Sequence, residues 1–283
     1  MLPVDIYGPQ RINSEGINLA DLQVLNELQQ DLVQLPTQTW HATPLVNGRE
    51  LKGPENLIFN PANYQQVVGS VIDSDQNAIA EALRVTYSAA KRWRLLAVKT
   101  RAAYLQKTAE LLEKNRLELV SLCVREAGKT IHDAHTEIRE AVDFCRYYVH
   151  SAVGLFNQPM NLTGSTGETN QLYQYGRGVF VCISPWNFPI AIFIGQITAA
   201  LVSGNTVIAK PARQTPLSAM RCIQLLHQAG IPEDVLQFLP GDGAHIGNQL
   251  LSDKRISGVA FTGSLATARL INQQLAKLPG IIP

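Results

Sequence analysis

The second half of the chain alternates short β-type runs with helical stretches, and this rhythm limits the possible fold more than any other feature. From Gly178 onward it predicts a strand followed by a helix, four times in succession. The expected strands are Val179–Ile183, Thr206–Lys210, Val235–Leu239 and Gly258–Phe261, and the expected helices are Ala191–Ser203, Pro216–Gln228, Ala244–Leu251 and Leu265–Ala276. Such alternation is typical of an α/β fold with a parallel sheet and right-handed crossovers. Ligands of these sheets bind beyond the carboxyl ends of the strands, so the residues after each strand are the candidates for function.

The first strand end carries the motif Ser184-Pro185-Trp186-Asn187-Phe188-Pro189, which follows Ile183. Its prolines restrict the loop and Trp186 offers a flat apolar wall. The Asn187 amide is a neutral donor that could stabilise a developing oxyanion. On residue type alone, a hydrogen bond from Asn187 to its own loop backbone is the more common outcome, so both roles stay open.

The second and third strand ends add a cation and a glycine-rich turn. Lys210-Pro211-Ala212-Arg213 places positive charge where phosphate or ribose hydroxyls would bind, although a solvated lysine would give the same pattern. After the third strand, Gly241, Gly243 and Gly247 form GxGxxxG, one residue longer than the usual dinucleotide fingerprint. The pattern is weak by itself, but it indicates a tight turn that a ligand can approach closely.

The fourth strand end, Phe261-Thr262-Gly263-Ser264, opens a helix. Free N–H groups and the Ser264 hydroxyl would then face the same way, which favours an anion, while an ordinary serine N-cap is the alternative. Together, the four motifs at four consecutive strand ends of one sheet predict a dinucleotide site.

The preceding residues divide into three zones. Residues 1–40 show no packed pattern apart from a helical stretch at Leu19–Leu35, and residues 41–157 are expected to be mainly helical. Residues 158–177 hold a turn-rich run, 163–169, between apolar residues, which predicts an exposed hairpin. Within 41–157 the pattern predicts a strand pair at Asn56–Ile72 and then helices at Asp75–Trp93 (Asp75 as N-cap), Thr100–Lys114, Arg116–Ala127 and Asp133–Val153.

Composition excludes several classes of protein. The 283 residues include 24 Lys+Arg and 23 Asp+Glu, and a net charge of +1 argues against a nucleic-acid partner. With 46% apolar and 17% charged residues, the chain is expected to fold around a sizeable core. The N-terminus does not resemble a signal peptide, and the most apolar stretch, Phe188–Val202, is too short for a membrane span. We therefore expect a soluble, cytoplasmic protein with no transmembrane segment.

The cysteine pattern fits that compartment. The chain has four cysteines: Cys123, Cys145, Cys182 and Cys222. They form no CxxC pair and lie in apolar periodic segments, which favours buried and unreactive thiols.

Two motifs in the helical zone look functional but are expected to be incidental. Gly128-Lys129-Thr130 ends like a phosphate-binding loop, yet the glycine required upstream is missing. His132 and His135 lie one helical turn apart with Glu137 as the only further candidate ligand, so no metal site is predicted. The remaining histidines, including His227, are expected at the surface.

Taken together, the motifs resemble those of the aldehyde dehydrogenase superfamily. The matching segments keep the family's order and spacing: ISPWNFP at 183–189, GNTVIAKPA at 204–212 and FTGS at 261–264. The segments REAGKT at 125–130 and EAVDFCRYY at 140–148 are similar to the L-glutamate γ-semialdehyde (1-pyrroline-5-carboxylate) dehydrogenase module of bifunctional enzymes of proline catabolism. The segment YGPQRINS at 7–14 resembles the joint that follows the flavin-dependent proline dehydrogenase module in those enzymes.

The resemblance implies roles for residues of this chain. The implied reaction is the NAD(P)-dependent oxidation of the small aldehyde L-glutamate γ-semialdehyde to L-glutamate, in which Asn187 donates to the oxyanion of a thiohemiacetal. Lys210 would hold the cofactor's ribose, Ser264 would meet its pyrophosphate, and Glu140 would belong to the substrate pocket. The hairpin at 158–177 would be the oligomerisation flap of a homo-oligomer. The implied cofactor contacts are Ile183, Ser184, Pro185, Trp186, Lys210, Arg213, Gly243, Gly247, Phe261, Thr262, Gly263 and Ser264.

Two departures from the family pattern matter. Arg213 stands where the family usually has a glutamate that grips the ribose hydroxyls, so NAD is the expected cofactor with some tolerance of NADP. The chain reaches Pro283 before the family's nucleophilic cysteine and base glutamate, so residues 178–283 are expected to be an incomplete Rossmann-like region without the catalytic domain. Such a fragment, truncated at both ends, is predicted to bind cofactor, to lack dehydrogenase activity alone and to be poorly soluble.

Two alternatives stay open at this stage. The parent enzyme could oxidise another aldehyde, because the segment that anchors the substrate is missing. The chain could instead be a non-catalytic module for dinucleotide binding or oligomerisation, which should be folded and soluble as it stands.

Overall fold

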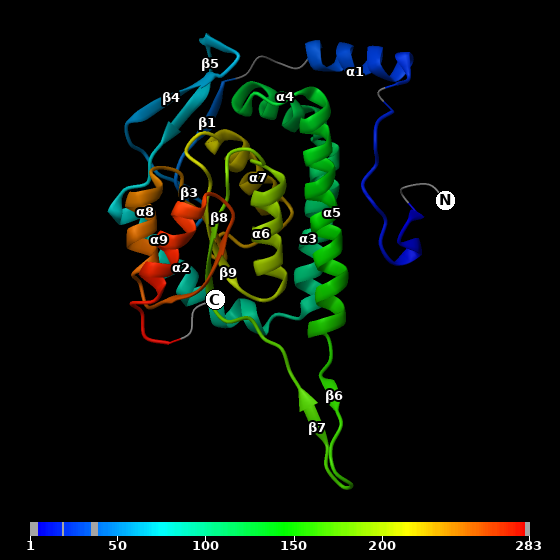
Figure 1. Ribbon diagram of the computed structural model, residues 1–283, viewed down its shortest axis with the longest axis vertical. Helices are drawn as coiled ribbons and strands as arrows, with labels where there is room; N and C mark the ends of the chain where they lie inside the picture. Colours follow the sequence, from blue (N-terminus) through cyan, green and yellow to red (C-terminus); the bar gives the residue numbers. More distant parts are fainter. Residues whose placement is uncertain (1–4, 19, 35–38, 281–283) are drawn as a thin grey trace.

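The computed structural model describes residues 5–18, 20–34 and 39–280 (Figure 1). A 3-10 turn, η2, lies at Gly8–Gln10. The helices are α1 (Leu22–Gln34), α2 (Gln76–Leu95), α3 (Val98–Lys114), α4 (Arg116–Ala127), α5 (Ile131–Phe156), α6 (Ala191–Val202), α7 (Pro216–Gln228), α8 (Gly243–Leu251) and α9 (Leu265–Leu275). The strands are β1 (Trp40–Ala42), β2 (Leu45–Val46), β3 (Arg49–Glu50), β4 (Glu55–Asn60), β5 (Asn63–Ile72), β6 (Met160–Leu162), β7 (Asn170–Leu172), β8 (Val179–Ile183), β9 (Thr206–Lys210), β10 (Leu236–Phe238) and β11 (Ile256–Phe261).

The central sheet has the strand order β11-β8-β9-β10-β2-β3. The four predicted strands β8 to β11 pair in parallel, which confirms the predicted α/β architecture. The sheet continues further than predicted, because β2 pairs antiparallel with β10 through Leu45 and Phe238, and β3 pairs with β2. The β10 edge of the parallel sheet is therefore covered. Strands of two residues have no periodicity, which explains why residues 45–50 gave no strand signal.

Helices cover both faces of this sheet (Figure 1). On one face α3, α5, α6 and α7 enclose a core in which the rings of Phe193 and Phe238 meet edge to face, 6.3 Å between centroids. On the other face α2 and α8 pack around Ile79, Ile208 and Ile246. Strands buried on both faces read as continuous apolar runs, and this is the form in which β8 and β9 occur in the sequence.

The predicted helices of the middle zone are confirmed, with shifts at their ends that capping explains. α2 begins at Gln76 because the Asp75 carboxylate accepts from Ala78 N at 2.8 Å. α5 begins at Ile131, two residues before its predicted start, because the Thr130 hydroxyl caps its first turn. α4 ends at Ala127, and the next residue, Gly128, has a φ of +68°, the left-handed conformation that a glycine adopts without strain.

The zone 41–157 contains more strand than predicted. β4 and β5 form the predicted antiparallel pair, and β1 adds to β5 in parallel through Trp40, His41 and Ala42. A three-residue strand shows no alternation, so the sequence gives no sign of it.

The first zone is packed where no packing was predicted. Ser14 is only 3% exposed, and its N–H and hydroxyl donate to the two oxygens of Asp143 on α5, at 2.7 and 2.8 Å. The Arg11 guanidinium lies 3.5 Å from the centre of the Tyr7 ring. The predicted helix at residues 19–35 is confirmed as α1, although Leu19 and Leu35 lie outside the described residues.

The predicted hairpin is confirmed as the antiparallel pair β6–β7, which projects from the body of the molecule (Figure 1). The rings of Tyr173 and Tyr175 stack beside it with centroids 6.3 Å apart. Its large apolar side chains are exposed to solvent: Met160, Leu162, Leu172, Tyr173 and Tyr175. An exposed apolar ribbon of this kind is typical of a contact surface.

Candidate functional site

A cavity of about 1080 Å³ lies where the carboxyl ends of β8, β9 and β11 meet. Parallel strands end at one edge of the sheet, so loops far apart in the sequence share this cavity. The structure brings the predicted cofactor residues and Asn187 together in its wall: Ile183, Ser184, Pro185, Trp186, Asn187, Lys210, Arg213, Gly243, Gly247, Phe261, Thr262, Gly263 and Ser264. Glu140 does not line it and is exposed on α5.

The Asn187 loop, residues 184–190, forms one wall of the cavity. Trp186 is 54% exposed and presents its ring as the predicted apolar surface. The main-chain carbonyl of Asn187 accepts from Nζ of Lys129 at 3.0 Å. Its side-chain amide makes no hydrogen bond to the residues that the structure describes, so it is not used to bond its own loop. That amide is available to a ligand.

Lys210 is buried rather than solvated, with 5% of its surface exposed. Its Nζ donates to the carbonyl of Pro211 at 2.8 Å, and a Cβ added at Gly243 would lie 3.6 Å from it. Burial lowers the pKa of Lys210 to about 8, while the nearby carboxylates of Asp242 and Asp73 oppose that shift. The cavity thus contains a cation that a bound anion or hydroxyl would stabilise.

The glycine-rich turn leads from β10 into α8. Gly241 has a φ of +132°, which a side chain would make strained. Asp242 caps α8 by accepting from His245 N at 2.9 Å, and this hydrogen bond, helped by Arg213 and Lys210, lowers the pKa of its carboxyl. A Cβ added at Gly247 would meet nothing within 4 Å, so this face of α8 is open.

The fourth strand end places Ser264 as the N-cap of α9, with its hydroxyl accepting from Thr267 N at 3.2 Å. The predicted serine cap is therefore present. A side chain does not fit at Gly263, because its Cβ would lie 2.7 Å from Cζ of Phe261. The ring of Phe261 therefore packs against Gly263 at the start of α9.

Ser184 provides a further polar group. The residue is 5% exposed and lines the cavity, and its hydroxyl has no hydrogen-bond partner in the described part of the chain. A buried hydroxyl without a partner costs free energy unless a ligand or water satisfies it.

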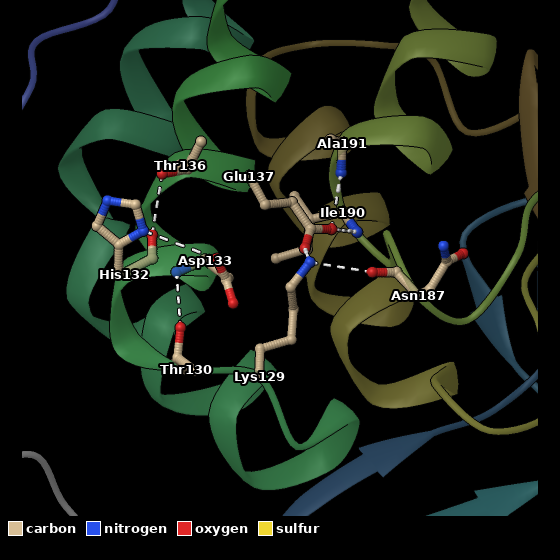
Figure 2. A network of polar contacts seen from close by, with 9 residues as sticks. All are labelled: Lys129, Thr130, His132, Asp133, Thr136, Glu137, Asn187, Ile190 and Ala191. Carbon is tan, nitrogen blue, oxygen red and sulfur yellow. Dashed lines mark hydrogen bonds and ion pairs between the residues drawn. The ribbon is translucent and has the colours of Figure 1, made fainter.

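Two residues that the sequence marked as incidental form a buried network beside the cavity (Figure 2). Glu137 is fully buried, and one oxygen of its carboxylate accepts from Ile190 N at 2.7 Å and Ala191 N at 3.1 Å. The other oxygen pairs with the Lys129 ammonium. Glu137 lies on the buried, apolar face of α5 together with Ala134. A charged residue at such a position was the one sign in the sequence that Glu137 has a buried partner.

A second buried carboxylate, Glu126 on α4, caps α7. It accepts from the backbone amides of Leu217 at 2.6 Å and Ser218 at 2.8 Å, and from the Ser218 hydroxyl. Burial raises the pKa of Glu126 to about 7, although these donors act in the opposite direction.

Of the histidines predicted at the surface, His41, His150 and His245 are exposed, and His227 is not. His227 is half-buried, its Nδ1 lies 2.9 Å from the carbonyl of Ile231, and burial lowers its pKa, so the surface prediction was wrong. His135 is buried on α5, and burial lowers its pKa to about 4. Helix packing, which periodicity does not show, accounts for both.

The prediction of buried, unreactive cysteines is confirmed. All four are free and buried, and none lines the cavity. Burial raises the pKa of Cys145 to about 12 and raises the pKa of Cys123, Cys182 and Cys222 well above the usual range. None of the described helices is long and apolar enough to cross a membrane.

The fold is that of an α/β protein with a cavity at the carboxyl edge of a mainly parallel sheet. The model described as "Aldehyde dehydrogenase family" matches residues 52–281. The chain belongs to the aldehyde dehydrogenase family, which confirms the resemblance seen in the motifs.

Relatives and solved structures narrow the similarity. The chain is 42% identical over 275 residues to the Bifunctional protein PutA of Salmonella typhimurium, covering 97% of this chain and 20% of that protein. It is 38% identical over 242 residues to the 1-pyrroline-5-carboxylate dehydrogenase of Anoxybacillus flavithermus, covering 84% and 47%. A structure of proline utilization A with proline bound in remote sites superposes with a TM-score of 0.84 at 39% identity, covering 99% of this chain and 25% of that one.

A structure of 1-pyrroline-5-carboxylate dehydrogenase from Thermus with bound NAD superposes with a TM-score of 0.89 at 30% identity, covering 95% of this chain and 53% of that one. The chain therefore spans about a fifth of the length of the PutA relative and about half the length of the 1-pyrroline-5-carboxylate dehydrogenases.

Proposed function

We propose that this chain is the cofactor-binding part of an NAD-dependent L-glutamate γ-semialdehyde (1-pyrroline-5-carboxylate) dehydrogenase. The observation that carries the proposal is that Lys210, Ser264 and Asn187 all line one cavity at the strand ends. The names of the relatives support the substrate, and the NAD-bound Thermus structure supports the cofactor.

The residues of the cavity fit an NAD-type dinucleotide. The unpartnered hydroxyl of Ser184 and the buried ammonium of Lys210 would bind ribose hydroxyls. The amides at the start of α9, with Ser264, would bind the pyrophosphate. Gly243 and Gly247 leave room for the adenine side, and the aromatic and aliphatic wall is formed by Ile183, Trp186 and Phe261. When bound, the cofactor supplies the hydride acceptor.

Arg213 is proposed to widen the cofactor choice to NADP. The residue is exposed at the cavity rim, and its charge acts on Asp242 together with that of Lys210. A guanidinium cannot accept hydrogen bonds from ribose hydroxyls, but it pairs well with a 2′-phosphate.

Asn187 is proposed to stabilise the oxyanion that forms when a thiolate adds to the aldehyde. Its amide is free for this purpose, and a fixed neutral donor in a partly apolar cavity is effective at such a task. The thiolate itself must come from outside the four cysteines of this chain, because all four are buried away from the cavity. Glu140, exposed on α5, remains a proposed substrate contact.

The partners follow from the same proposal. The apolar hairpin β6–β7 is proposed as the flap through which copies of the enzyme associate. A flavin-dependent proline dehydrogenase module is proposed to precede residues 7–14, in line with the bifunctional relatives. The four reduced thiols suit the cytoplasm as the proposed compartment.

Calorimetric titration of the purified chain with NAD⁺ and NADP⁺ tests this proposal. We expect one site per chain for NAD⁺, and measurable binding of NADP⁺ at the same site. Arg213→Glu should weaken NADP⁺ by about tenfold or more relative to NAD⁺. Arg269→Glu, which makes the same charge change on α9 at a residue that does not line the cavity, should leave the ratio unchanged. No NAD⁺ binding would contradict the function, and no NADP⁺ binding, or an unchanged ratio of the two affinities in Arg213→Glu, would contradict the role of Arg213.

A further inference from the structure

We propose that Lys129 is a positioning residue for Asn187, acting as a partner of Glu137 to fasten the Asn187 loop to α5. The inference rests on the proposed function only for the role of the Asn187 amide. The fastening itself is a property of the free protein.

Lys129 contacts the loop directly. Its Nζ donates to the main-chain carbonyl of Asn187 at 3.0 Å and lies 4.3 Å from the centre of the Phe188 ring. The Lys129 side chain is 12% exposed and the Glu137 side chain is fully buried, so their ion pair is made largely out of water, whereas the hydrogen bond to Asn187 lies at the surface. Lys129 reaches this place because Gly128 and Thr130 form the turn between α4 and α5.

Glu137 holds the other end of the same loop. Its carboxylate binds the amides of Ile190 and Ala191, where the loop enters α6, and it also pairs with Lys129. The loop is therefore held at two points that are three residues apart. Figure 2 shows the carbonyl of Asn187 turned toward Lys129 and its side-chain amide turned away.

The contact with Asn187 separates positioning from simple stabilisation. A helix cap on α6 needs only Glu137, since a carboxylate at a helix N-terminus is favourable by itself. If Lys129 served stability alone, its ion pair with Glu137 would be sufficient and no contact with the Asn187 loop would be needed. Lys129 continues to the carbonyl of Asn187, and fixing that carbonyl fixes the peptide plane from which the candidate oxyanion donor projects.

Fluorine NMR on chain labelled with 5-fluorotryptophan tests this inference without needing activity. The chain has three tryptophans. Trp186 lies in the Asn187 loop, whereas Trp93 is fully buried and Trp40 is in β1, so the last two serve as internal controls. The Trp186→Phe variant assigns the loop resonance.

Three variants are compared with the wild type. Lys129→Met removes the contact but leaves Glu137 buried without its cation. Lys129→Met with Glu137→Gln removes both charges while an amide oxygen still caps α6. Arg146→Met breaks another largely buried ion pair, with Glu113 between α5 and α3, and is the matched control.

If Lys129 positions the loop, the melting temperature and the line width of the Trp186 resonance should respond differently to these variants. Lys129→Met should lower the melting temperature and broaden the Trp186 resonance by about twofold or more, with Trp40 and Trp93 unchanged. The double variant should regain most of the melting temperature and keep the broad Trp186 resonance. Arg146→Met should leave that resonance sharp.

The inference is overturned if the Trp186 resonance of the double variant is as sharp as in the wild type. It is also overturned if Arg146→Met broadens Trp186 equally. Addition of NAD⁺ to the wild type should shift Trp186. If it does not, the proposed function fails, while the fastening by Lys129 is still judged from the line widths of the free protein.

Discussion

Glu137 and Arg101 hold opposite ends of α6, each with the charge that the helix dipole favours there. The Glu137 carboxylate binds the first amides of the helix, and Nε of Arg101 donates to the carbonyl of Val202 at its last residue, at 2.9 Å. α6 begins where the Asn187 loop ends. The two buried charges therefore fix the helix that supports one wall of the cavity.

Arg101→Met should destabilise the fold. Arg101 is 3% exposed, and besides Val202 it donates to the carbonyls of Trp93, Arg94 and Leu96 at the end of α2. Methionine would leave these partly buried carbonyls without a donor, so we expect a loss of about 3 kcal/mol in the free energy of unfolding. Urea unfolding measures it. Arg94→Met, at an exposed position on α2, is the control, and equal losses for both variants would contradict the prediction.

Glu126 should make stability depend on pH. Its pKa is raised to about 7 in the folded protein, so the folded state binds the proton more tightly than the unfolded state. That contribution is fully present below the ordinary pKa of a glutamate and is lost as pH rises through about 7, with a size of up to about 3 kcal/mol.

Glu126→Gln removes this titration. We expect the unfolding free energy of the wild type to fall relative to that of the variant between pH 5 and pH 8, as measured by urea unfolding at both values. Glu110→Gln on the exposed side of α3 should show no such change. A difference between wild type and Glu126→Gln that is independent of pH would refute the explanation.

Dinucleotide affinity should rise as pH falls, because of Lys210. Its pKa is about 8 in the free protein, and the phosphates of a bound dinucleotide favour the protonated form, so binding takes up a proton. We expect the Kd for NAD⁺ to fall by about tenfold from pH 9 to pH 7. Lys210→Met should bind more weakly and lose this dependence. A wild-type Kd that stays constant over the range would show that Lys210 does not act on the ligand.

The purified chain should not turn over glutamate semialdehyde. Each of its four thiols is buried with a raised pKa, so no thiolate can reach the aldehyde in the cavity. The test is the absorbance of NADH in the presence of NAD⁺ and the semialdehyde. NADH formation that disappears in a cysteine-free variant would contradict the prediction. Calorimetric titration of the same protein preparation with NAD⁺ alone serves as the control for cofactor binding.

The sequence could predict that the residues after the four strands lie close together, because parallel strands end at the same edge of a sheet whatever the details of packing. Ser184 and Lys210 therefore line one cavity, but the burial of Lys210 is a result of tertiary packing, which periodicity does not report. Lys129 and Glu137 were set aside because they resemble fragments of unrelated motifs, and only the packing of α5 against α6 gives them a partner.

Two other features were missed for physical reasons. β2 and β3 are held by pairing with a distant strand, and two residues carry too little pattern to predict that. Ser14 is buried through the Asp143 carboxylate, a long-range contact between polar residues that hydrophobic patterning does not register.

The location of the dinucleotide is tested most directly by titrating three forms of the chain with NAD⁺ in a calorimeter. Gly247→Leu places a side chain into the open side of α8 in the cavity, where a Cβ meets nothing within 4 Å. Gly154→Leu makes the same change at an open helical glycine on α5 that does not line the cavity. We predict one site for the wild type and Gly154→Leu, and binding at least about thirtyfold weaker for Gly247→Leu with an unchanged melting temperature. Equal affinity in all three forms would place the dinucleotide elsewhere and contradict the account.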